Sequence, residues 1–258
     1  MDLTVADMMV GERLFLGTYG VGESSQPIAW LKATRNSDFL AEHVLDYIYF
    51  DGREAHHDDY YLRNYGNSNY NQSNIFQFLN SEDDDWFEPA HQYDEAPGTA
   101  NHSRTAAGMY RNHPGFLSGF EGYEIESLKS KVHLPIVADI VGGRRFELFN
   151  RKGIRAHGTQ DMVIYRNGHD FTETSWIDYW TQSSYNQYAA HIIGRDGYSK
   201  NKTATQSCGL RPKCRVNPNA KIVALPDGSG YQLVAFEANH CKNEACTLDE
   251  LKAFIGLL

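Results

Sequence analysis

Short runs of apolar residues, separated by Gly- and Ser-rich turns, dominate the first part of the chain and are typical of β-strands. Residues Arg13–Tyr19 and Pro27–Ala33 form two such runs and predict a β-hairpin. Asp38–Asp51 suits a strand pair or a short helix about equally, and its run YIYF favours strands. A last hairpin is predicted over residues 221–236, with its turn at Asp227–Gly230.

Helices are predicted where a capping residue precedes apolar side chains at helical spacing. Ser73 caps the first helix, and the asparagines before it are interpreted as loop residues. The inward positions of this helix are Ile75, Phe76 and Leu79, and its outward positions are Asn74, Gln77 and Asn80. The second helix starts at a Ser-x-x-Glu capping box, Ser118 and Glu121. A third, over residues 247–258, starts at Thr247 and Glu250.

The segments between these elements give weaker patterns. Residues 89–113 predict a long surface loop, and residues 131–143 a strand followed by a turn. Residues 144–158 suit a short strand or a short helix, and residues 161–171 suit a strand and turn. Strand-sized pieces separated by turns are predicted from residue 178 to residue 217.

Composition supports a β-rich protein, since the 258 residues include 16 Tyr, 13 Phe and 22 Gly. The formal charge of -9 disfavours nucleic acid and anionic membranes as partners, because both select basic surfaces. The N-terminus has no basic start followed by an apolar core, and no apolar run is long enough to span a membrane. We therefore expect a soluble protein, made in the cytoplasm without a signal peptide.

All four cysteines, Cys208, Cys214, Cys241 and Cys246, lie near the end of the chain and lack close Cys-x-x-Cys pairs. Free thiols are the preferred interpretation. A disulfide between Cys208 and Cys214, formed after release into an oxidising medium, is the alternative.

Two charged clusters are weighed as sites and interpreted otherwise. His56–Asp59, followed by Tyr60 and Tyr61, suits metal ligands or a carbohydrate-facing patch. A solvated loop is the preferred interpretation, because four adjacent residues cannot all face one ion. Glu82–Asp85 lacks the alternate spacing of a calcium loop and is read as an acidic turn. The chain shows no nucleophile triad, phosphate loop or zinc helix, so we assign no catalytic residue, no metal and no cofactor.

The order of several motifs resembles a family of domains of unknown function that is frequent in bacteriophages and prophages of Gram-positive bacteria. The segments that carry it are VGERLFLGTY, PIAWLKA, YGNSNYNQSNIFQFLNS, PGFLSGFEGYEI, YWTQSS and GLRPKCRV, over roughly Val10–Asn217. The matching residues are Trp30, Leu31, Asn67, Ser68, Asn69, Tyr70, Ser73, Asn74, Leu79, Asn80, Ser81, Gly115 to Leu117, Glu121, Trp180, Thr181, Ser183, Gly209, Arg211 and Pro212.

The G-x-RP pattern is also similar to the last strand of C-type-lectin-like domains, including relatives of formylglycine-generating enzymes and retroelement variable proteins. This resemblance implies an α+β fold, C-type-lectin-like, with loop-rich antiparallel β-structure and two or three short helices. We expect such a domain over residues 1–217, followed by a hairpin and short amphipathic helix over residues 218–258.

The resemblance implies a noncatalytic virion protein, a decoration, neck or tail-associated module that uses this domain for protein–protein interaction. Its expected partners are other virion proteins, including copies of itself as a homo-oligomer. A receptor- or glycan-binding adhesion protein that touches the host surface is one alternative. A copper- or thiol-dependent oxidase is another, because the enzymes similar in fold use a cysteine pair, to which Cys208 and Cys214 would correspond.

Residues 179–201 form the candidate binding surface, because Tyr, Asn, Ser and Gln are the side chains of adaptable binding surfaces. The candidate residues are Tyr179, Gln182, Tyr185, Asn186, Tyr188, Tyr198 and Asn201. The competing interpretation places polar residues outward on ordinary strands, with Trp176, Tyr179 and Trp180 in the core.

Overall fold

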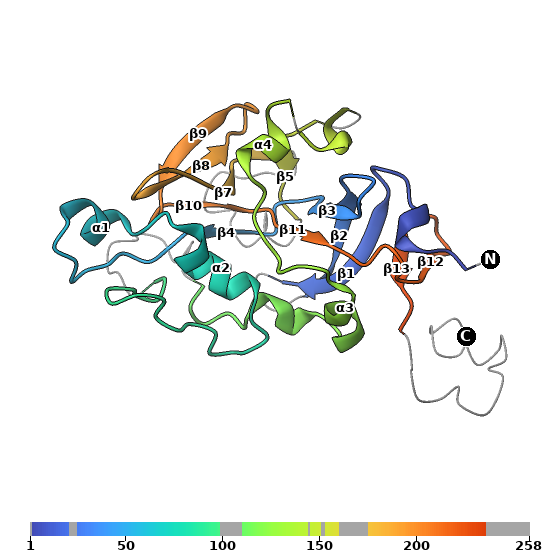
Figure 1. Cartoon of the computed structure of the whole chain (residues 1–258), viewed down its shortest axis with the longest axis horizontal. Coiled ribbons are helices and arrows are strands. Elements are labelled where there is room, and N and C mark those ends of the chain that lie inside the picture. The colour runs from blue at the N-terminus through green and yellow to red at the C-terminus, as the bar shows by residue number, and fades with distance from the viewer. Residues whose placement is uncertain are drawn as a thin grey trace.

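Two main β-sheets and a few short helices make up the fold, which is mixed and mostly β (Figure 1). The computed structural model describes residues 2–20, 25–98, 110–143, 145–150, 153–159 and 175–235. In Figure 1 the six-stranded sheet lies at the right and the five-stranded sheet at the upper left. The predicted strand of residues 161–171 and the predicted C-terminal helix lie outside the described residues.

The six-stranded sheet has the strand order β11-β3-β2-β1-β13-β12. Its strands are β1 (Arg13–Tyr19), β2 (Gln26–Lys32), β3 (Asp38–Ala41), β11 (Lys213–Arg215), β12 (Ile222–Ala224) and β13 (Tyr231–Leu233). The predicted β1–β2 and β12–β13 hairpins are both confirmed as antiparallel pairs. The second hairpin joins the first through β13, which pairs with β1 in parallel.

The five-stranded sheet has the order β4-β10-β7-β8-β9, and a separate two-stranded sheet pairs β5 with β6. These strands are β4 (Asp46–Tyr49), β5 (Ala156–His157), β6 (Trp176–Ile177), β7 (Tyr179–Asn186), β8 (Ala189–Ile193), β9 (Ser199–Thr203) and β10 (Ser207–Leu210). Asp38–Asp51 thus forms two strands, β3 and β4, as its aromatic run predicted, and the strands belong to different sheets. Only β10 and β7 pair in parallel among the described strands of the five-stranded sheet.

Four short α-helices lie within the described ranges, one more than the upper limit predicted from the sequence. They are α1 (Tyr60–Tyr65), α2 (Asn74–Leu79), α3 (Gly122–Ser127) and α4 (Val137–Ile140). Four 3-10 helices accompany them: η1 (Val5–Asp7), η2 (Tyr70–Gln72), η3 (Phe116–Gly119) and η4 (Glu147–Asn150). None of the helices in these ranges has the length and apolar character of a membrane span.

Two helix predictions need correction. The strand expected in residues 131–143 is reduced to an isolated bridge between His133 and Lys213, and the following residues form α4. The Asp139 carboxylate accepts a hydrogen bond from the Ile136 N–H (3.0 Å) and caps this helix. Ser118 lies in η3 and does not cap α3. Instead Glu121 is the N-cap residue of α3, and the Glu124 carboxylate accepts its N–H at 2.8 Å.

Two tryptophans anchor the core that joins the sheets. Trp30 on β2 and Trp180 on β7 are fully buried, and both belong to one cluster that also contains Phe39 on β3 and Phe78 on α2. Their indole N–H groups donate to backbone carbonyls of other strands, Trp30 to Leu16 on β1 (2.8 Å) and Trp180 to Ile48 on β4 (2.9 Å). A buried indole paired in this way adds apolar area without leaving a polar group unsatisfied.

The GLRP segment lies where β10 of one sheet continues toward β11 of the other. Gly209 allows a close approach of β10 to β7, because a Cβ there would lie 2.5 Å from the carbonyl oxygen of Asp178. The buried Arg211 guanidinium donates to the carbonyls of Ala41 (3.0 Å) and Ile154 (3.1 Å) and lies over the ring of Tyr179. The G-x-RP motif therefore holds the scaffold together.

Candidate functional site

The Asn-rich segment, residues 63–81, folds into α1, η2 and α2 in succession. Asp59 caps α1 by accepting the N–H groups of Tyr61 (2.7 Å) and Leu62 (3.1 Å). The helix ends at Gly66, whose φ of +69° and close approach to the Gly52 carbonyl both require glycine. Ser73 caps α2 as predicted, since its hydroxyl accepts the Phe76 N–H.

Asp51, at the end of β4, fixes this segment to the scaffold. Its buried carboxyl accepts the backbone N–H of Asn74 (2.9 Å) and that of Asn67 (3.1 Å). Asn74 is also fully buried, and its side-chain amide accepts the Gly52 N–H (2.7 Å) and donates to the Asp94 carboxylate (3.1 Å). The prediction that Asn74 faces outward is therefore wrong, since its amide links α2 to Gly52 and Asp94 inside the protein.

Ser68 joins the Asn-rich segment to the turn between β7 and β8. Its N–H donates to the carbonyl of Gln187 (3.0 Å), and its hydroxyl contacts both the Ser184 hydroxyl (2.7 Å) and the carbonyl of Asn186. Segments more than 110 residues apart in sequence are thereby held side by side.

An open groove of about 570 Å³ lies between these two segments. It is lined by Leu62, Asn67, Ser68, Asn69, Tyr70, Asn71, Ile136, Gln182, Ser184 and Gln187. Every one of these lining residues is uncharged, and most offer amides or hydroxyls. The groove can therefore hydrogen-bond a polar, uncharged ligand.

Four tyrosines form a cluster, which we call the tyrosine rim, beside the groove: Tyr60, Tyr61, Tyr65 and Tyr188. The rings of Tyr61 and Tyr188 stack with centroids 4.9 Å apart, and Tyr60 meets Tyr61 edge-on at 5.6 Å. Tyr60 and Tyr61 are 58% and 48% exposed. Large, half-exposed aromatic side chains held by packing are typical anchors of binding surfaces.

The residues predicted as the binding surface are only partly brought together. Gln182 lines the groove, and Asn186 and Tyr188 lie in or beside the β7–β8 turn at its end. Tyr198 and Asn201 are exposed at the β8–β9 turn and on β9, and Tyr185 meets His191 edge-on. The turn with Tyr198 joins the opposite end of β8 from the turn beside Tyr188.

Tyr179 does not belong to any surface. It is fully buried, and its hydroxyl donates to the carbonyl of Ile154 at 2.7 Å. The competing interpretation, which places Tyr179 in the core, describes its position, because both faces of β7 are covered at this end: Tyr179 packs in one core cluster and Trp180 in the other. The binding surface predicted from the sequence did not include the rim residues of α1 or the groove-lining residues Asn67, Asn69 and Asn71. The high density of Tyr and Asn in residues 60–71 could have indicated them.

Three acidic residues next to the Asn-rich segment, Asp51, Glu54 and Asp94, lie close enough to interact electrostatically. The Glu54 carboxylate, 2% exposed, faces His57 Nε2 at 3.7 Å and His91 Nε2 at 3.5 Å. Burial raises the pKa of Glu54, and the two histidines oppose this shift. Burial also raises the pKa of Asp94 and, more strongly, that of Asp51. Among the described residues no group of three His, Cys, Asp or Glu is arranged to hold a metal ion.

This cluster gives a pH-dependent prediction for Glu54→Gln. Because the folded pKa of Glu54 lies above its ordinary value of 4.5, the folded chain binds more protons between those two values. The stability contributed by Glu54 is therefore present below pH 4.5 and falls as the pH rises through this window. In thermal melts, the midpoint of the variant should rise relative to that of the wild type as the pH increases from 4.5 toward neutral. Each kcal/mol of unfolding free energy that the wild type loses should shift this difference by roughly 2–4 °C. A difference between Glu54→Gln and the wild type that stays constant with pH would contradict it.

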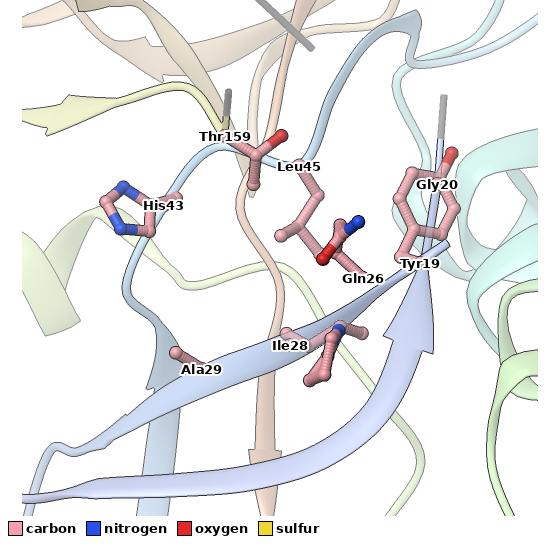
Figure 2. A pocket seen from close by; sticks show the side chains of 9 residues that line it. Tyr19, Gly20, Gln26, Ile28, Ala29, His43, Leu45 and Thr159 are labelled. Atoms are coloured by element: carbon pink, nitrogen blue, oxygen red, sulfur yellow. The ribbon is translucent and has the colours of Figure 1, made fainter. Parts of the chain in front are cut away.

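A second, smaller cavity of about 60 Å³ lies between β2 and the chain after β3 (Figure 2). Figure 2 shows Tyr19, Leu45 and Thr159 around it, with His43 at one side. Burial lowers the pKa of His43, whose Nδ1 has no hydrogen-bond partner within the described residues. The volume suits about two water molecules, so the groove is the better candidate site.

Both described cysteines are structural in character. Cys208 and Cys214 are free and buried, as the preferred interpretation predicted. Burial raises the pKa of the Cys208 thiol to about 12 and that of Cys214 further. Because burial disfavours the thiolate, both thiols are poor nucleophiles.

Comparison with known families matches residues 40–218 to a domain of unknown function, DUF6273. This match covers more than half of the chain, and the chain belongs to this family. It includes the Asn-rich segment, β7, β8 and the GLRP segment, and hence the whole groove. No curated protein and no solved structure matches the chain.

Proposed function

We propose that the chain is a noncatalytic structural protein of a bacteriophage or prophage particle. In this proposal it is a decoration, neck or tail-associated module whose C-type-lectin-like domain serves as an interaction platform. The platform is the face that carries the groove and the tyrosine rim. The resemblance of the family motifs to phage and prophage domains supports the virion assignment.

The observation that carries the proposal is the construction of this face. Asp51, Ser68 and Gly66 fix the Asn-rich segment on rigid strands, so the exposed tyrosines are held in place before any partner arrives. A preorganised surface loses less conformational entropy on binding. Exposed aromatic side chains that bind no partner would not need to be held in one position.

The chemistry of the described residues favours binding over catalysis. The groove lining contains no carboxylate, imidazole or thiol that would serve as an acid, base or nucleophile. The oxidase alternative depends on a thiolate pair, and the high pKa of both described thiols argues against that role.

Particle fractionation tests the proposal. Phage particles are purified on a density gradient from a host that carries the gene, and each fraction is examined by mass spectrometry. We expect peptides of this chain to co-migrate with capsid and tail proteins at a fixed ratio. Recovery of the chain only in particle-free fractions would overturn the virion assignment.

A further inference from the structure

The groove is uncharged on a chain in which 22% of the residues are charged. An anionic ligand would find no cation in the lining and a net charge of -9 around it. A cationic ligand would find no carboxylate in the lining. The groove therefore selects a ligand that is polar and neutral.

Two lining amides are available to such a ligand. Within the described residues, no protein group hydrogen-bonds the side chains of Asn71 and Gln182, which lie on opposite walls of the groove. The side-chain N–H₂ group of Asn69 donates to Gln72 (2.8 Å), and that of Gln187 donates to Asp59 (3.4 Å). The side-chain carbonyl oxygen of each residue remains as an acceptor for a ligand. The walls thus present donors and acceptors together, which is the pattern that hydroxyl groups match, because each hydroxyl both donates and accepts.

The tyrosine rim supplies the apolar part of the site. The rim is next to lining residues in sequence on two segments: Tyr61 precedes the lining residue Leu62 in α1, and Tyr188 follows the lining residue Gln187 in the β7–β8 turn. Tyr188 stacks on Tyr61 at 4.9 Å and an interplanar angle of 11°, which fixes the orientation of the Tyr61 ring. A flat aromatic surface beside amide groups fits a molecule with one C–H face and a hydroxyl edge.

We propose that the groove binds a neutral oligosaccharide, with Asn71 and Gln182 bonding its hydroxyls and the tyrosine rim packing against a sugar face. The inference rests on the proposed function, for which it names the ligand class. It requires no divalent cation, since the lining offers amide and hydroxyl groups and no carboxylate.

A glycan array with the purified chain tests the inference. We expect binding to neutral glycans and none to sialylated or sulfated ones, and binding that persists in EDTA. For the best array ligand, titration calorimetry should show at least a tenfold loss of affinity in the variant Asn71→Ala/Gln182→Ala. The matched control Asn219→Ala, an exposed amide outside the groove lining, should bind like the wild type. Equal thermal melts of all three proteins verify that the fold is retained.

Three results would overturn the inference: binding to no neutral glycan, binding to charged glycans alone, or an affinity that the double variant leaves unchanged. Binding to an array of uncharged peptides in place of glycans would also overturn it, and would identify the groove as a polypeptide site. None of these results alters where the chain migrates in a particle gradient, so failure of the ligand class and failure of the virion assignment are distinguishable.

Discussion

Replacement of Asp51 by alanine is expected to lower the free energy of unfolding by about 3 kcal/mol, because one buried and one half-buried backbone N–H group lose their acceptor. The loss should appear as a lower midpoint in urea unfolding with an unchanged slope. Asp51→Asn keeps one carbonyl oxygen in place and should lose about half as much. The groove should open as well, since Asn67 and Asn74 are held by this carboxyl.

The control for Asp51 is Asp58→Ala, which removes an exposed carboxylate from the same stretch of chain. It is expected to change stability by less than about 0.5 kcal/mol. Equal effects of the two substitutions would show that Asp51 is not the anchor of the Asn-rich segment.

Arg211→Met is expected to destabilise the chain by about 3–5 kcal/mol, an effect comparable to breaking a buried ion pair. The guanidinium donates to carbonyls of Ala41, Ile154 and, at 3.5 Å, Glu42, and methionine would remove all three hydrogen bonds, although the Ile154 carbonyl would keep the Tyr179 hydroxyl as a donor. Lysine keeps the charge but lacks the planar fork, so Arg211→Lys should recover only part of the loss.

Arg35→Met provides the comparison for Arg211. The Arg35 side chain is 86% exposed and pairs with Glu147 at the surface. Because exposed ion pairs contribute little, its removal should cost less than about 1 kcal/mol in the same unfolding assay. A loss for Arg211→Met within that range would refute the structural role of the GLRP arginine.

The sequence predicted the elements whose signals are local. The β1–β2 and β12–β13 hairpins follow from alternation and turn residues, and the start of α2 follows from the Ser73 cap. A strand was predicted in the stretch that contains α4, because its nearly continuous apolar run has no clear period. Without a period, the sequence cannot distinguish a helix from a strand.

The site was less predictable because it is made by tertiary contacts. The groove walls come from residues 67–71 and 182–187, and the contact between Ser68 and Ser184 brings them together. Composition identified residues 179–201 as adaptable but could not separate Gln182 in the groove from the buried Tyr179. Asn74 shows the same limit, since its burial depends on Gly52 and Asp94.

The central claim, that the tyrosine rim and groove form the working face of a virion protein, is tested most directly by complementation. A phage or prophage lacking the gene is supplied with the wild-type chain, with Tyr60→Ser/Tyr61→Ser, or with Tyr198→Ser, which alters the most exposed of the described large hydrophobic side chains. Particle yield and infectivity are then measured. The account predicts at least a tenfold loss for the double variant and wild-type behaviour for Tyr198→Ser. Wild-type behaviour of the double variant, or equal loss in both, would contradict it.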